Sequence, residues 1–268
     1  MLKDITLGQY FPGNSVAHKL DPRTKILLVT LYIIALFSAK GLIGYAVMIA
    51  TLAACVKVSH VGLKSLVRGL KPLVVIIVFT GVLNVFFTPD THYLWEWGIL
   101  RISVKGVENA LFMVVRIMLL VMGTFLMTYT TSPIRLTDGL ESLLNPLKKI
   151  HVPVHELAMM MAIALRFIPT LIEETDKIIS AQKARGADFE SGSLFQKAKA
   201  LVPILVPLFI SAFRRADELA TAMECRCYHG GEGRTKLHVL KYQRRDYVAL
   251  TGGAVILVLV VVLRRLGI

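Results

Sequence analysis

Cysteine and acidic residues are both scarce in this chain. Only three of its 268 residues are cysteine, Cys55, Cys225 and Cys227, which excludes a small fold held together by disulfides. Asp and Glu number 18 against 31 Lys and Arg, so the formal net charge is +13. A surplus of this size is found in nucleic-acid-binding proteins, but here the basic residues alternate with acidic ones and lie between apolar segments. We interpret the surplus as contact with anionic lipid headgroups.

What the chain has in abundance is apolar sequence. It is 55% hydrophobic, with a mean hydropathy of +0.63. Five charge-poor runs approach the roughly 20 residues that cross a bilayer, namely Ile26–Ala39, Gly41–Val56, Pro72–Phe87, Val107–Tyr129 and Tyr247–Leu263. The sequence therefore predicts an all-α integral membrane protein with about five transmembrane helices, and not a soluble enzyme.

The first two runs are separated only by Lys40 and Gly41. A single helix over Ile26–Val56 would be about 46 Å long, whereas the hydrocarbon core of a bilayer is about 30 Å thick. Two short helices that turn at Lys40 and Gly41 fit better. A cleavable signal peptide is the alternative interpretation of Ile26–Ala39, and it is disfavoured because a second apolar run follows at once.

The distribution of Lys and Arg predicts the topology. These residues cluster before the first run, between the second and third runs, and throughout Arg135–Arg245. Cytoplasmic loops carry such an excess, so we place the N-terminus and the long segment 130–245 in the cytoplasm. The chain then divides into residues 1–129 with about four membrane helices, a cytoplasmic region of amphipathic helices at 130–245, and a C-terminal membrane helix at 246–268. This orientation puts the C-terminus outside the cell, where the positive charges of Arg264 and Arg265 do not fit the rule.

The cytoplasmic region has helical periodicity throughout. A hydroxyl cap followed by proline, Thr130–Pro133, predicts the start of an amphipathic helix over Ile134–Ile150. Two longer helices are predicted from about His155 to Ala184 and from about Leu194 to Tyr228. Each is apolar in its first half and charged in its second half, so the two resemble copies of one unit.

A position-by-position comparison of the two long helices at a constant offset supports this repeat. Four positions of the first helix match four of the second: Asp176, Ser180, Ala181 and Arg185 correspond to Asp217, Thr221, Ala222 and Arg226. Each arginine stands between two small residues, Ala184 and Gly186 in the first helix, Cys225 and Cys227 in the second. One interpretation is a cation at a helix C-terminus, worth about 0.3–1 kcal/mol. The other is a helix tip that enters a partner's pocket, where the planar guanidinium binds carboxylates and carbonyls.

The Ala184-Arg185-Gly186 and Cys225-Arg226-Cys227 triplets resemble the paired arginine motifs of EcfT, the transmembrane T component of energy-coupling factor transporters. The resemblance covers nearly the whole chain through further motifs, at Leu20–Lys25, Leu136–Glu141, Pro153–Ala158, Arg166–Thr170, Leu205–Phe209 and Gly231–Thr235. Cysteine replaces the usual neighbours of the second arginine, and it is also small.

This resemblance implies a multi-subunit importer of the ABC type in the cell membrane of a bacterium or archaeon, with residues 130–245 as its cytoplasmic coupling-helix region. Two cytoplasmic ATPases would dock on Ala184, Arg185 and Gly186 and on Cys225, Arg226 and Cys227. A substrate-binding S component would pack on the apolar faces of the coupling helices, and we name Met159, Met160, Met161, Leu165, Leu205 and Leu208 as its contacts. ATP would be used by the ATPases, so this chain would catalyse nothing and bind no cofactor. Simple packing is the alternative role for the methionine run, although Met adapts well to varied surfaces.

Two further features are assigned structural roles. Asp21 and Pro22 form a helix start, with Asp21 as N-cap, Pro22 at the first helical position and Arg23 as an interfacial anchor. Arg116 lies in the middle of the fourth apolar run, where a charge is costly unless it finds a partner. We expect either an interaction with backbone carbonyls or a position close to the cytoplasmic coupling helices, and a functional role for Arg116 stays open.

No metal or enzymatic motif is complete. His155-Glu156 lacks the second histidine of the H-E-x-x-H motif, because Met159 stands in its place. Cys225 and Cys227 have no companion ligands for a four-coordinate site, and Gly230–Thr235 does not match a phosphate-binding loop. A self-sufficient carrier and an integral membrane enzyme are the rival interpretations. The near absence of acidic residues from the apolar runs, where Glu108 at the edge of one is the exception, argues against an ion-coupled carrier.

Overall fold

The computed structural model describes residues 10–87, 93–97, 100–187, 189, 193–231 and 239–266. Its elements are α1 (Val16–Lys19), α2 (Pro22–Ser38), α3 (Gly41–Ser59), α4 (Leu63–Leu70), η2 (Lys71–Leu73), α5 (Val74–Phe87), β1 (Tyr93–Trp97), β2 (Leu100–Ser103), α6 (Val104–Thr130), α7 (Pro133–Leu144), η3 (Asn145–Ile150), α8 (Val154–Ala184), α9 (Leu194–Cys225) and α10 (Arg244–Arg265). The prediction of a helical membrane protein is confirmed, and the predicted break at Lys40 and Gly41 separates α2 from α3.

Five of the described helices are long and apolar enough to cross a membrane: Gly41–Ser59, Leu63–Phe86, Val104–Thr130, Val154–Ala184 and Arg244–Arg265. Four of them contain apolar runs that the sequence predicts as spans. The run Ile26–Ala39 also forms a helix, α2, but its 17 residues make it shorter than each of the five. The fifth is α8, predicted from sequence as a cytoplasmic helix. It is nevertheless long and apolar enough to count among the five, because its first half carries few charges.

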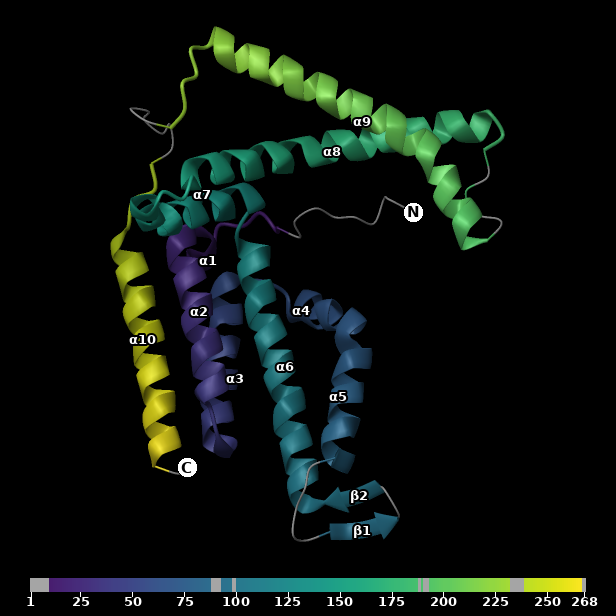
Figure 1. Ribbon diagram of the computed structural model, residues 1–268. Helices are drawn as coiled ribbons and strands as arrows, with labels where there is room; N and C mark the ends of the chain where they lie inside the picture. Colours follow the sequence, from purple (N-terminus) through teal and green to yellow (C-terminus); the bar gives the residue numbers. More distant parts are fainter. Residues whose placement is uncertain are drawn as a thin grey trace. The chain divides into compact units, whose positions relative to one another are not determined.

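One feature of the fold is absent from the sequence-based expectations. Between α5 and α6, β1 and β2 form an antiparallel hairpin in which Trp97 pairs with Leu100 and Glu96 pairs with Arg101. Tyr93, Trp95 and Trp97 are residues with high strand propensity. The hairpin connects two neighbouring helices, as Figure 1 shows.

The chain separates into two compact units, which we describe one at a time. The membrane unit comprises Gly8–Gly139 and Leu240–Ile268, and the crossed-helix unit comprises Leu140–Val239. The boundary falls inside α7.

In the membrane unit, α10 packs beside α2 although the two helices lie at opposite ends of the sequence (Figure 1). Leu36 of α2, Met48 of α3, Leu66 of α4 and Val260 of α10 are almost completely buried in the shared apolar core. Small residues allow the helices to approach closely. A side chain at Gly123 of α6, for example, would collide with the ring of Tyr32.

In the crossed-helix unit, α8 and α9 are the two long elements, and they cross each other (Figure 1). Ser193 and Gln196 cap the start of α9 with reciprocal hydrogen bonds. Pro169 lies inside α8, and Pro203 and Pro207 lie inside α9. Proline removes a backbone hydrogen bond and bends a helix, which agrees with the change of direction in the first half of α9 (Figure 1).

Candidate functional site

The two long helices of the crossed-helix unit end in the same backbone conformation. Arg185 is the C-cap of α8 with φ −86° and ψ 4°, and Arg226 is the C-cap of α9 with φ −93° and ψ 15°. The residue after each arginine has a positive φ, 87° at Gly186 and 55° at Cys227. Glycine adopts this left-handed conformation without strain, whereas cysteine does not.

Backbone hydrogen bonds at the two ends also correspond one to one. Each end has two bonds whose donors and acceptors match at the offset of the sequence repeat: Gly186 N to Lys183 O (3.0 Å) with Cys227 N to Glu224 O (2.8 Å), and Ala187 N to Gln182 O (3.0 Å) with Tyr228 N to Met223 O (3.0 Å). This pair of bonds defines the Schellman motif, which closes helices on a left-handed residue. The repeat therefore extends to the geometry of the two helix ends.

Both arginine side chains are exposed, as are their neighbours Ala184, Gly186, Cys225 and Cys227. Within the described parts of the chain, no carboxylate forms an ion pair with Arg185 or Arg226. Toward the described residues each guanidinium thus keeps its planar set of donors available, and it has no bulky side chain beside it in sequence. Such an end can insert into a pocket that offers carboxylate or carbonyl acceptors.

An ion pair marks where α8 and α9 meet. Arg215 Nη2 donates to Glu174 Oε2 at 2.7 Å, and the two side chains are 31% and 23% exposed. The two residues are separated by the offset of the repeat, so they occupy equivalent places in the two copies. The same number of residues separates Glu174 from Arg185 and Arg215 from Arg226, which is about 16 Å along each helix.

Contacts on either side of this pair show that the two arginine ends extend in opposite directions. Near the end of α8, Gln182 Nε2 donates to the carbonyl of Pro203, in the first half of α9 (3.4 Å). Beyond the end of α9, Gly231 lies against the ring of His155 at the start of α8, so closely that a side chain at Gly231 would collide with it.

His155 has a structural partner. Its Nδ1 lies 3.1 Å from Glu141 Oε1, and the ring is covered by Gly231. Among the described residues, no group of three His, Cys, Asp or Glu side chains is placed to hold a metal ion. The Glu232–Thr235 part of the glycine-rich segment lies outside the described residues.

Apolar side chains are exposed on the first half of α8 and on the first half of α9, which lie on opposite sides of the helix crossing. Met160, Met161 and Leu205 are exposed, whereas Met159, Leu165 and Leu208 are half-buried. The structure adds exposed residues that the sequence analysis did not name as contacts: Leu157, Leu201, Val202, Val206, Phe209, Ile210 and Phe213. For the residues between Leu201 and Ile210, the signal that could have identified them is the apolar composition of that stretch.

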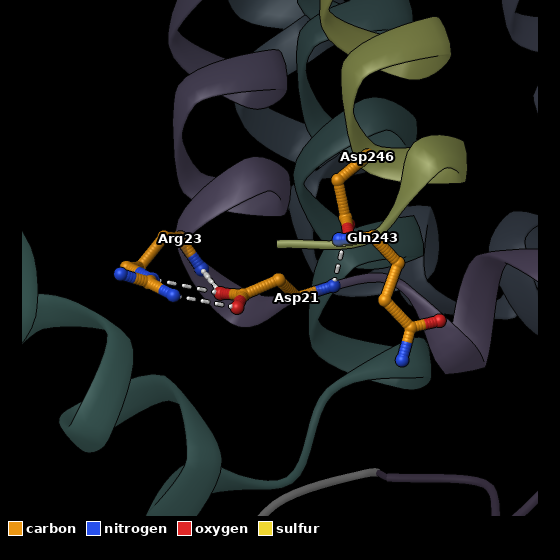
Figure 2. Close-up of polar contacts among 4 residues, drawn as sticks. All are labelled: Asp21, Arg23, Gln243 and Asp246. Atoms are coloured by element: carbon orange, nitrogen blue, oxygen red, sulfur yellow. Dashed lines mark hydrogen bonds and ion pairs between the residues drawn. The ribbon is translucent and has the colours of Figure 1, made fainter. Parts of the chain in front are cut away.

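In the membrane unit, Asp21 is the N-cap of α2 and Pro22 is its first residue. Figure 2 shows the polar cluster around this start. Asp21 Oδ1 accepts from the backbone N of Arg23 at 2.9 Å, and Asp21 Oδ2 accepts from the guanidinium of Arg23 at 2.9 Å. The Arg23 guanidinium also lies over the ring of Tyr242, 4.1 Å from its centroid.

Asp246, which the sequence analysis missed, completes this cluster. It is 1% exposed, and its Oδ1 accepts from the backbone N of Asp21 while its Oδ2 accepts from the backbone N of Gln243, each at 2.8 Å. A single carboxylate therefore joins the first turn of α10 to the start of α2. The acidic residue three positions after Gln243 in a helix start was the available signal.

The partner of Arg116 differs from the expected one. Arg116 Nε donates to the hydroxyl of Tyr45 on α3 at 2.8 Å, and its guanidinium lies 5.7 Å from the centroid of the Phe37 ring. The acceptor of this bond is therefore a side chain and not a backbone carbonyl. The phenol is within reach because α3 and α6 pack together in the membrane unit.

Comparison with known proteins identifies relatives over the full length. Residues 13–237 match the family model described as cobalt transport protein, CbiQ. The chain is 53% identical over 263 residues to the energy-coupling factor transporter transmembrane protein EcfT of Ruminiclostridium cellulolyticum, covering 98% of each chain. It is 54% identical over 267 residues to EcfT of Clostridium kluyveri (99% of this chain, 98% of the relative). With EcfT of Bacillus subtilis it shares 45% identity over 264 residues (98% of this chain, 100% of the relative).

Proposed function

Because the chain belongs to the EcfT family, the transmembrane proteins of energy-coupling factor transporters, we propose that it transmits ATP-driven movement to a separate substrate-binding subunit. The chain is a multi-pass membrane component of a multi-subunit transporter. In our proposal it is non-catalytic, and two cytoplasmic ATPases bind it and use the ATP. One membrane-embedded S component at a time receives the movement and delivers a vitamin or another micronutrient such as a metal ion.

The pairing of the two arginine ends carries this proposal. Two similar ATPases require two similar docking sites, and Arg185 and Arg226 share their cap conformation, hydrogen-bond pattern and small neighbours. The Glu174–Arg215 pair precedes the two arginines by the same number of residues in each helix. Movement of the two ATPases toward or away from each other would therefore act on two arms of equal length.

The length and charge of α8 indicate that this helix lies along the membrane surface and does not cross the membrane. Its 31 residues extend about 46 Å, well beyond a hydrocarbon core of about 30 Å. Its second half carries Glu173, Glu174, Asp176, Lys177 and Lys183, and such charges are costly in hydrocarbon. We therefore place α8 and α9 on the cytoplasmic side, where the N-terminus also lies in this proposal.

The apolar side chains exposed on each of α8 and α9 suit the S component. The proposed contacts are Met160, Met161 and Leu205, which are exposed, together with the half-buried Met159, Leu165 and Leu208. Burial of such side chains against another apolar protein is favourable by about 25 cal/mol per Å². Flexible methionines would allow S components of different sequence to use the same surface.

A charge-removing double variant tests the docking sites. Arg185→Gln combined with Arg226→Gln is expected to abolish co-purification of the ATPases with the tagged chain and to abolish uptake, while membrane insertion is unchanged. The matched control is Lys177→Gln with Arg214→Gln, which removes two cations from the same helices and is expected to retain both properties. Transport by the double arginine variant at the wild-type rate would refute the assignment.

A further inference from the structure

A cavity of about 630 Å³ lies within the membrane unit among α2, α3, α6 and α10. Its walls are mostly apolar, with Leu28, Leu52, Leu126 and Ile256 among the lining residues. Val248 and Gly252 of α10 line it and are exposed, so the cavity reaches the surface of the unit. Its volume falls in the range of small-molecule sites, about 300–1,000 Å³.

The cavity extends into the helical bundle from the side where α2 and α10 begin. Its lining comes from Lys25–Ala35 of α2, from Arg245–Ile256 of α10, and from the second halves of α3 and α6. Along α2 it extends from Lys25 to Ala35, a distance of about 15 Å. That distance is half of a hydrocarbon core of about 30 Å, which is the depth of one lipid leaflet.

Two basic residues lie at the end of the cavity where α2 and α10 begin. Lys25 is only 6% exposed, and its Nζ donates to the carbonyl of Thr130 at 2.8 Å and to Thr131 Oγ1 at 3.0 Å. An ammonium group has three donors, and the third has no acceptor in the part of the chain that the structure describes. Arg245 also lines the cavity and donates to Gln243 Oε1.

The charge of Lys25 is poorly compensated. No carboxylate of the described residues forms an ion pair with it, and Arg135 adds a repulsive charge interaction while Asp246 adds an attractive one. Both carboxylate oxygens of Asp246 are already used, by the backbone N of Asp21 and of Gln243. A buried cation with an unused donor therefore faces an apolar cavity, and an anionic group at this end would complete its coordination.

We propose that this cavity binds one anionic phospholipid, with its phosphate at Lys25 and Arg245 and an acyl chain between α2, α3, α6 and α10. The leaflet is the one on the side where α2 begins. This site is separate from the arginine ends, so it does not depend on the proposed coupling function.

Gly252 offers a way to close the cavity without disturbing packing. A Cβ at Gly252 would meet no atom within 4 Å, so the position is open toward the cavity. Gly252→Leu would place a branched side chain in the space for the acyl chain. Gly252→Ala is the control, because it brings the same gain in helix propensity with much less volume.

The test measures lipid retained by the tagged chain together with its co-purifying subunits. The complex is reconstituted in nanodiscs that contain phosphatidylcholine and phosphatidylglycerol, extracted in mild detergent, and analysed for bound lipid by mass spectrometry. We expect wild type and Gly252→Ala to retain phosphatidylglycerol, and Gly252→Leu to lose it. Arg245→Gln is expected to weaken retention about fivefold, the contribution of one basic residue near an anionic lipid, whereas Arg244→Gln, an exposed neighbour outside the lining, leaves it unchanged.

Three results would overturn the proposal. Equal retention by Gly252→Leu and wild type would show that the lipid binds elsewhere. If the wild-type protein retained as much phosphatidylcholine as phosphatidylglycerol, Lys25 and Arg245 would not select an anionic lipid. If the isolated chain retains lipid but the assembled complex does not, a helix of a partner protein fills the cavity instead.

Discussion

Arg215 and Glu174 form an ion pair between equivalent positions of two repeated helices, with Nη2 and Oε2 2.7 Å apart. The contact of a residue with its own counterpart means that each helix continues for the same number of residues to its terminal arginine. Sequence repetition alone does not require this, because two identical helices can cross at any register. Because the helices cross at matched positions, Arg185 and Arg226 lie at equal distances from the crossing.

Charge exchange at the crossing is expected to preserve function. Glu174→Arg alone places two cations together and should reduce transport strongly, whereas Glu174→Arg combined with Arg215→Glu should restore most of it. The partly exposed pair contributes less than about 1 kcal/mol to the free energy of unfolding, so melting temperatures should change little. Transport and thermal melting of the purified complex measure the two effects.

Glu173→Gln is the control for this experiment, since Glu173 is the exposed neighbour of Glu174. A charge-exchanged protein no more active than Glu174→Arg alone would contradict the role given to the pair.

The two helix ends should respond in opposite ways to substitution at their left-handed residues. Gly186→Ala introduces a side chain at φ 87° and should weaken the end of α8 by about 1 kcal/mol. Cys227→Gly relieves the same conformation and should strengthen the end of α9 by a similar amount while uptake is retained. Hydrogen exchange of the backbone amides of Gly186, Ala187, Cys227 and Tyr228 measures both changes. Faster exchange in Cys227→Gly would argue against the shared geometry.

Tyr45→Phe is expected to destabilise the membrane unit by about 1–3 kcal/mol, because the substitution leaves the Arg116 guanidinium without one hydrogen bond. The hydroxyl that it removes is the acceptor for Arg116 Nε. Tyr45→Phe combined with Arg116→Met should be close to wild type in thermal melting, because both partners are then apolar. If this folded double variant loses transport, Arg116 has a role beyond structure.

Asp246→Ala is expected to lower the free energy of unfolding by about 1–3 kcal/mol, because buried donors lose their acceptor. These donors are the backbone N–H groups of Asp21 and Gln243 at the junction of α2 and α10 (Figure 2). Thermal melting of the detergent-solubilised chain tests this. The matched control is Asp138→Ala, because the Asp138 carboxylate forms no hydrogen bond with the described residues. Equal melting temperatures for the two variants would contradict the expectation.

Local features were predictable because they depend on neighbours in sequence. Asp21 before Pro22 indicates a helix start by capping chemistry, and the apolar runs indicate membrane helices by length. The repeat of the two long helices pointed to Arg185 and Arg226 as related positions. The hairpin between α5 and α6 was missed because short strands without a clear turn signal are hard to separate from loops. The sequence analysis did not name α8 as a possible membrane span. A long helix that is apolar in one half has the length and hydropathy of a span and also the pattern of a cytoplasmic amphipathic helix.

Sequence by itself determined the composition of the helices, their capping residues and the two matched arginine ends, since propensity, hydropathy and short-range hydrogen bonds act within a few residues. Tertiary structure decided which distant groups meet: Asp21 with Asp246, Arg116 with Tyr45, and Glu174 with Arg215. It also decided that Lys25 is buried at one end of an apolar cavity. Such pairings follow from how whole helices pack, and packing depends on the shape and burial of surfaces that no local pattern records.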